Sequence, residues 1–148
     1  MPDAKGQPRL PGDRAGCDAP RRRGAKRTSA ELEAVVLSIL RASPRPLGAY
    51  AIARKSRSLG VPLSPNQVYR ILERLRGRVR RVETLNAYFE DRSDAAAVTL
   101  CRACGRAGSL RVDLGPEIMA LARAKNFRAE NVIIEVRGKC PDCAAVYG

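Results

Sequence analysis

The sequence predicts an α+β protein with two folded parts, and two observations lead to this fold class. Between residues 28 and 92, apolar residues recur at helical spacing in three segments, and two short β-like runs follow them. Between residues 93 and 148, short β-like runs and one helical segment surround two Cys-x-x-Cys pairs. We therefore expect an N-terminal unit of helices and a hairpin, a small C-terminal α/β unit, and a basic tail over residues 1–27.

The first helix is expected to begin after Thr28. Thr28 and Glu31 have the spacing of a capping box, in which a hydroxyl and a carboxylate each satisfy the other residue's backbone donor. Pro44 and Pro46 end the helix. An apolar stripe lies between these signals and consists of Leu32, Val35, Val36, Ile39 and Leu40. A second helix is expected from Leu47 to about Ser58.

The third helix has the most distinctive sequence of the N-terminal half. Ser64 is a predicted cap, Pro65 suits the first helical position, and Gln67 suits the reciprocal capping position. One face is apolar and is predicted to be buried: Val68, Ile71, Leu72 and Leu75. The opposite face carries groups that can reach base edges and phosphates: Asn66, Tyr69, Arg70 and Glu73.

A basic hairpin should follow, with strands at 79–84 and 87–91 around Leu85 and Asn86. Three short helices and a basic hairpin form the winged helix-turn-helix arrangement of DNA-binding domains. An alternative is that the same elements only pack together, without a nucleic-acid partner. The residues predicted to contact DNA are Asn66, Gln67, Tyr69, Arg70, Arg74, Arg78, Arg80 and Arg81.

The charge of the chain favours a nucleic-acid partner. Its 148 residues include 28 Lys and Arg against 15 Asp and Glu, which gives a formal net charge of +13. Most of this excess lies before residue 93, so contacts with phosphate are expected in the N-terminal two thirds. A basic surface that is merely solvated is an alternative on charge alone. Residues 1–27, which lack an apolar period, are expected to be a disordered tail that either attracts phosphate loosely or precedes the true start.

The predicted location is the cytoplasm. No run of about 18 apolar residues is present, so no membrane contact is expected. The arginines at 21–23 are followed by polar residues rather than by an apolar stretch, so no secretion signal is expected either.

The C-terminal unit is predicted to be built around four cysteines. Strands are expected at 98–100, 110–112 and 131–136, with a helix at 116–125. Cys101 and Cys104 form one Cys-x-x-Cys turn, and Cys140 and Cys143 form another. Four thiolates complete a tetrahedral zinc site with no open position, so we expect one structural, non-catalytic Zn²⁺ per chain. A redox-active dithiol and paired disulfides are the alternatives, and Cys17 is expected to be a free thiol.

The segment 63–75, Leu-Ser-Pro-Asn-Gln-Val-Tyr-Arg-Ile-Leu-Glu-Arg-Leu, resembles the recognition-helix motif of the ferric uptake regulator family. The segments 81–88 and 46–50 are similar to the wing and the second helix of its zinc uptake regulator branch. The paired cysteines match the structural zinc site of the family's C-terminal dimerisation domain. The resemblance covers roughly residues 30–145. It implies a homodimer that binds an inverted-repeat operator in double-stranded DNA and represses metal-uptake genes, without a small-molecule substrate.

The chain also departs from this family at the second, metal-sensing site. That site is built largely from His with Cys, Asp or Glu, and this chain contains no His. Arg80 and Asp91 stand where the zinc branch has its hinge His and the Cys after the wing. We therefore expect weakened or lost metal sensing. An alternative function is a family relic that acts through protein contacts or mixed dimers. An enzyme is not expected, because no acid/base pair, activated nucleophile or phosphate loop is present.

Overall fold

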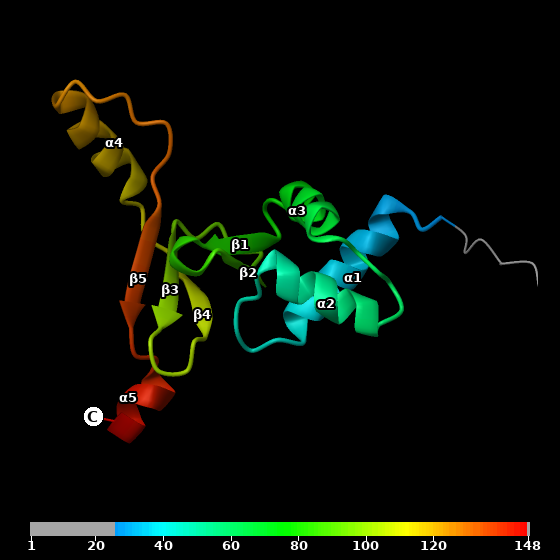
Figure 1. Cartoon of the computed structure of the whole chain (residues 1–148). Coiled ribbons are helices and arrows are strands. Elements are labelled where there is room, and N and C mark those ends of the chain that lie inside the picture. Colours follow the sequence, from blue (N-terminus) through cyan, green and yellow to red (C-terminus); the bar gives the residue numbers. More distant parts are fainter. Residues whose placement is uncertain (1–25, 148) are drawn as a thin grey trace, which may run out of the picture.

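A computed structural model describes residues 26–147 of the chain (Figure 1). The first part holds three helices and a hairpin with a 3-10 turn: α1 (Ser29–Arg41), α2 (Ala49–Ser58), α3 (Pro65–Arg74), β1 (Val79–Val82), η1 (Glu83–Leu85) and β2 (Ala87–Glu90). The second part holds three strands and two helices: β3 (Ala97–Cys101), β4 (Ala107–Leu110), α4 (Gly115–Ala124), β5 (Ile134–Gly138) and α5 (Pro141–Tyr147). The predicted α+β fold class is confirmed. Cys17 and nearly all of the predicted tail lie outside the described residues.

Both predicted capping boxes are present. Glu31 N donates to Thr28 Oγ1 at 3.3 Å, and Thr28 N donates to Glu31 Oε2 at 2.7 Å. At α3, Gln67 N donates to Ser64 Oγ at 3.2 Å, and Ser64 N donates to Gln67 Oε1 at 2.9 Å. Each box satisfies two backbone donors that the first turn of a helix leaves without partners, and so fixes where the helix begins.

The three helices enclose one apolar core. Its centre is formed by Val36, Ile52 and Val68, none of which has any exposed surface. The predicted apolar face of α3 is buried as expected. Leu37 is also buried although it lies outside the predicted stripe of α1, because α1 is in contact with α2, α3 and β2. The second helix begins two residues later than predicted, since Leu47 forms an isolated bridge to Tyr88 in the hairpin.

The hairpin is shorter than the sequence predicted. β1 and β2 pair antiparallel, with Val79 opposite Glu90 and Val82 opposite Ala87. The expected end of the first strand, residues 83–84, belongs instead to the 3-10 turn. Asn86 closes this turn in the left-handed conformation, with φ 45°. Asn tolerates this conformation better than most residues, so a local turn forms where extended strand was expected.

The second part is a three-stranded sheet in the order β4-β3-β5. β3 pairs antiparallel with β4 and parallel with β5. The strands predicted at 110–112 and 131–136 are present with shifted bounds, as β4 at 107–110 and β5 at 134–138. The chain reverses at once after the first cysteine pair, with Cys101 N bonded to Arg106 O at 2.8 Å, so β4 begins at Ala107. The last strand begins only at Ile134, and α5 was not predicted.

Helix α4 packs poorly against the rest of the chain. Figure 1 shows it standing away from the three-helix part, beyond the start of β5. None of its residues is buried, and the side chain of Leu121 is 70% exposed. Ile118 is exposed as well. The large apolar side chains of this helix, Ile118 and Leu121, are therefore not covered within residues 26–147.

A second, small core joins the hairpin to the sheet. Val82 of β1 packs with Val98 and Leu100 of β3, and Phe89 and Ala107 lie against them. This cluster places the hairpin between the three-helix part and the sheet, as Figure 1 shows. Among the described residues, no helix is both long enough and apolar enough to cross a membrane.

Candidate functional site

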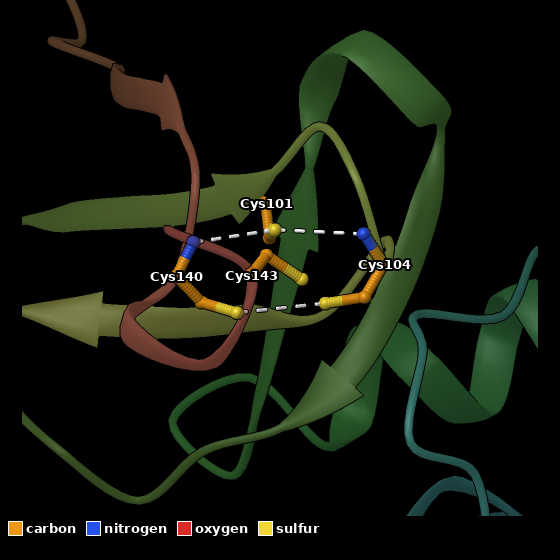
Figure 2. Close-up of side chains that lie close together, drawn as sticks. All are labelled: Cys101, Cys104, Cys140 and Cys143. Carbon is orange, nitrogen blue, oxygen red and sulfur yellow. Dashed lines mark hydrogen bonds between the residues drawn. The ribbon is translucent and has the colours of Figure 1, made fainter. Parts of the chain in front are cut away.

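The structure brings the two Cys-x-x-Cys turns together (Figure 2). The Sγ atoms of Cys101, Cys104, Cys140 and Cys143 all lie within 4.8 Å of one another. The sulfurs of Cys104 and Cys140 are 3.7 Å apart. Four sulfurs around one zinc ion, each at about 2.3 Å, would be about 3.8 Å apart. The cluster is therefore suited to a structural zinc ion held by four protein sulfurs.

The local fold explains why these four side chains converge. Cys101 is the last residue of β3 and pairs with Gly138, the last residue of the parallel strand β5. Each cysteine pair thus follows the carboxyl end of one of two neighbouring strands. The first turn is tight because Gly105 adopts φ +75°, a conformation that L side chains rarely take. A Cβ there would also lie 3.3 Å from Cδ of Arg45.

Hydrogen bonds to sulfur prepare the cluster for a cation. The backbone N–H groups of Cys104 and Cys140 donate to Cys101 Sγ at 3.5 and 3.3 Å, and they lower the pKa of Cys101 to about 5. The contact with Cys140 and partial burial raise the pKa of Cys143 to about 12. The charge of a Cys101 thiolate adds a smaller contribution to this rise. A divalent cation would offset the repulsion between thiolates. With sulfur at all four positions around it, no position would be left for catalysis.

The outer face of α3 remains available to a partner, with two exceptions. Asn66, Arg70 and Glu73 are exposed, as the helical spacing predicted. Tyr69 is half-buried and packs against the helical core. Gln67 is exposed but its amide oxygen is used in the capping box.

The five predicted arginines differ in their surroundings. Arg70 and Arg78 are exposed and make no ion pair within residues 26–147. Arg74 forms an ion pair with Glu33 of α1 at 2.8 Å, and Arg81 forms one with Glu83 in the turn of the hairpin. Arg80 is half-buried and points into the junction with the sheet, so it differs from the others in both burial and contacts.

The family resemblance places Arg80 and Asp91 where the zinc branch has two ligands of its sensing site. In the structure the two side chains are in contact. Arg80 Nε lies 3.4 Å from Asp91 Oδ2. The residues that surround this pair, Ser93, Ala95 and Ser109, were not singled out by the sequence. Periodicity and motif spacing carry no signal for them, because their proximity comes only from the packing of the hairpin against the sheet.

The chain matches no protein-family model and no curated protein. Two solved structures are similar to it along most of their length. One is a zinc uptake regulator in its holo form, XcZur, with 28% identity, a TM-score of 0.67, and coverage of 77% of this chain and 84% of the other. The second is a zinc uptake regulator complexed with zinc and DNA, with 25% identity, a TM-score of 0.68, and coverage of 82% and 99%.

The structural match extends over most of both neighbours, 84% of one chain and 99% of the other. The architecture, the sequence of α3 and the cluster of four cysteines together make the chain similar to zinc uptake regulators of the ferric uptake regulator family.

Proposed function

We propose that the chain is a transcription regulator that binds an inverted repeat in double-stranded DNA as a homodimer. Residues 28–92 would form the DNA-binding domain and residues 93–148 the dimerisation domain. The observation that carries the proposal is helix α3, which is buried on one face and presents Asn66 and Arg70 on the other. The likeness to a zinc uptake regulator solved with zinc and DNA supports it.

The chemistry of this face fits a major groove. The guanidinium of Arg70 offers paired donors to a guanine edge, and the amide of Asn66 can pair with adenine. Arg78 is exposed just before β1 and can neutralise a phosphate, as can Arg81 within the hairpin. Because each phosphate contact releases counterions, binding is expected to weaken steeply as salt is raised.

The proposal of a homodimer is supported by the surface of the second part. Helix α4 has no buried residue, and β5 is an edge strand with one side unpaired. Exposed edges and apolar helix faces are normally covered in a stable protein. A second copy would cover the apolar residues that cluster in this part: Leu110, Leu114, Ile118, Leu121, Ile133 and Val136. A dimer would also set the spacing between two recognition helices.

We propose further that the chain controls zinc-uptake genes and that its metal sensing is weakened or lost. The chain contains no His. Apart from the four cysteines, the described residues contain no group of three or more His, Cys, Asp or Glu side chains that could hold a metal. Structural zinc would order the second part, and a change in free zinc would find no further site of comparable affinity.

The test is binding to an inverted-repeat operator from a zinc-uptake promoter, followed by fluorescence anisotropy. Structural zinc is retained while free zinc is varied. We expect tight binding that falls with salt and does not change with zinc. Arg70→Ala should weaken it, whereas Arg123→Ala on α4 serves as a control that also removes one positive charge.

Each other outcome removes one element of the proposal. Binding that rises with free zinc would contradict the loss of sensing. Absence of specific binding would contradict the DNA-binding function and would favour a regulator that acts through protein contacts or mixed dimers.

A further inference from the structure

Arg80 ties the hairpin to the segment that leads into the sheet. It lies on β1, and its Nη2 donates to the carbonyl oxygen of Ser93 at 3.2 Å and to that of Ala95. Its Nε faces Asp91, which follows β2. One guanidinium therefore binds two backbone carbonyls and one carboxylate from residues 91–95, the connection between the two parts of the molecule.

Asp91 extends this network to the sheet. Its carboxylate accepts hydrogen bonds from Ser93 N and Ser93 Oγ, both at 2.8 Å, and from Ser109 Oγ on β4. Burial raises the pKa of Asp91, but the hydrogen bonds from Ser109 and Ser93 and the charge of Arg80 outweigh it, so the pKa lies below its ordinary value. Asp91 is therefore an anion at neutral pH and remains able to pair with the guanidinium of Arg80.

The burial of this pair distinguishes it from a surface ion pair. The side chains of Arg80 and Asp91 are 29% and 11% exposed, whereas that of the neighbouring Arg81 is 45% exposed. Surface ion pairs contribute little because water and salt screen them. A half-buried guanidinium that also binds carbonyl oxygens is screened less, and its planar donors fix the direction of each bond.

A second contact acts across the same junction. Thr84 N, in the turn of the hairpin, donates to Glu135 Oε2 on β5 at 3.2 Å. Val82, which packs with Val98 and Leu100 of β3, lies between Arg80 and Thr84 in the sequence. The hairpin is thus held to the sheet by an apolar cluster and by two polar contacts, of which the Arg80 contact includes an ion pair.

We propose that Arg80 is a positioning residue whose guanidinium, held by Asp91, fixes the hairpin against the C-terminal sheet in one arrangement, without a second metal ion. This inference deepens the proposed function, on which it rests for its biological meaning. It explains how a regulator that lacks a sensing site can keep its recognition helices correctly spaced. The arrangement itself is a property of the free protein and can be measured without DNA.

The first experiment compares Arg80→Met with Arg81→Met in the zinc-loaded full chain. Both variants remove one positive charge from β1 and leave the same unbranched apolar side chain. Hydrogen exchange of the amides at 91–97 and 107–110 reports the junction. We expect Arg80→Met to speed this exchange on the order of tenfold, while Arg81→Met leaves it unchanged. Small-angle scattering should show a more extended particle for Arg80→Met alone. Unchanged exchange and scattering in Arg80→Met would overturn the proposal.

Zinc titration of the wild-type chain gives a second, independent readout. Beyond one equivalent per chain, added zinc should change neither the exchange at the junction nor the scattering profile. A change on binding of a second equivalent would overturn the proposal, because the arrangement would then depend on an ion.

Ser109→Ala keeps the test decisive if Arg80→Met does not fold. It removes only the hydrogen bond between β4 and Asp91. We expect faster exchange at the junction, by less than in Arg80→Met, with the three-helix part unaffected. Wild-type exchange rates in Ser109→Ala would contradict the role given to Asp91.

DNA binding separates positioning from phosphate contact. Arg81→Met should reduce the slope of log affinity against log salt by about one, whereas Arg80→Met should lower affinity without changing that slope. A reduced slope in Arg80→Met would assign it to phosphate instead and would overturn the proposal. If the wild-type chain binds no DNA, the proposed function fails, while exchange and scattering still decide the role of Arg80.

Discussion

The two parts of the molecule are held together by different forces. In the three-helix part, Ile52, Val68 and Ile71 are almost completely buried in a core of their own. In the sheet part, apolar burial is confined to β3 and its immediate neighbours, and α4 buries nothing. The first part is therefore stabilised by hydrophobic burial, whereas the second buries little and would depend on the proposed zinc ion and partner subunit. Four predictions test this contrast.

Removal of the metal should have the largest effect. Cys140→Ser, or a strong chelator, should unfold the sheet part while α1–α3 remain folded, because only the sheet part depends on the cluster. Structural zinc sites contribute on the order of 10 kcal/mol to folding. Circular dichroism and hydrogen exchange should show a partial loss of structure together with loss of one zinc per chain. Cys17→Ser is the control and should retain both. A fully folded Cys140→Ser protein without metal would refute this prediction.

A cavity in the helical core should destabilise the three-helix part and leave the sheet part intact, the reverse of metal removal. Ile71→Ala removes buried methyl groups from α3 and should lower the free energy of unfolding of the first part by about 2–5 kcal/mol. Zinc content should stay at one per chain. Leu59→Ala, at an exposed position of the same part, should cost less than about 0.5 kcal/mol. Urea denaturation measures both, and equal effects of the two changes would contradict the core described above.

A charge on the exposed face of α4 should separate subunits without unfolding either part. Leu121→Glu places a carboxylate on the surface assigned to the partner and should weaken the dimer by about 2 kcal/mol or more. Sedimentation over a range of concentrations measures this dissociation. Arg123→Glu, on the same helix, changes the charge by −2 rather than −1 and is the control for the effect of charge alone. A dimer of undiminished affinity in Leu121→Glu would place the interface elsewhere.

Loss of a helix cap should have the smallest of the four effects. Ser64→Ala removes the side-chain acceptor for Gln67 N at the start of α3 and should cost about 1 kcal/mol. Since this cap orients the recognition helix, DNA affinity should fall slightly too. Ser58→Ala, at the end of α2, should leave the melting temperature nearly unchanged. Identical melting of the Ser64→Ala variant and the wild type would show that the cap is not required.

The same contrast explains how far the sequence could predict the structure. The first part could be predicted from residues close in the sequence. The capping boxes at Thr28 and Ser64 and the apolar face from Val68 to Leu75 each depend on residues within one or two helical turns. The convergence of the four cysteines could be predicted as well, because two Cys-x-x-Cys pairs are typical of a zinc site. The start of the strand at Ala107 was missed because a tight turn at Gly105 sets it.

In the Arg80 cluster, only the positions of Arg80 and Asp91 had a signal in the sequence, through the family resemblance, and the other members had none. Ser109 lies 18 residues from Asp91, and no periodicity relates the two. Only the packing of the hairpin against β3 and β4 brings them together. Long-range polar contacts of this kind depend on the finished tertiary structure, whereas caps and stripes depend on a single turn of helix.

The parallel pairing of β3 with β5 has a consequence for how such a protein can diverge. Because Cys101 and Cys140 lie at the ends of adjacent strands, the chain between them runs through β4, leaves the sheet for α4 and returns along β5. A zinc ion bound to the cysteines would close this stretch into a loop whose two ends are fixed. Doubling the length of such a loop costs only about 0.6 kcal/mol in closure entropy. The part between β4 and β5, which holds α4, can therefore be lengthened or exchanged, and the choice of subunit partner can change while the three-helix part stays as it is.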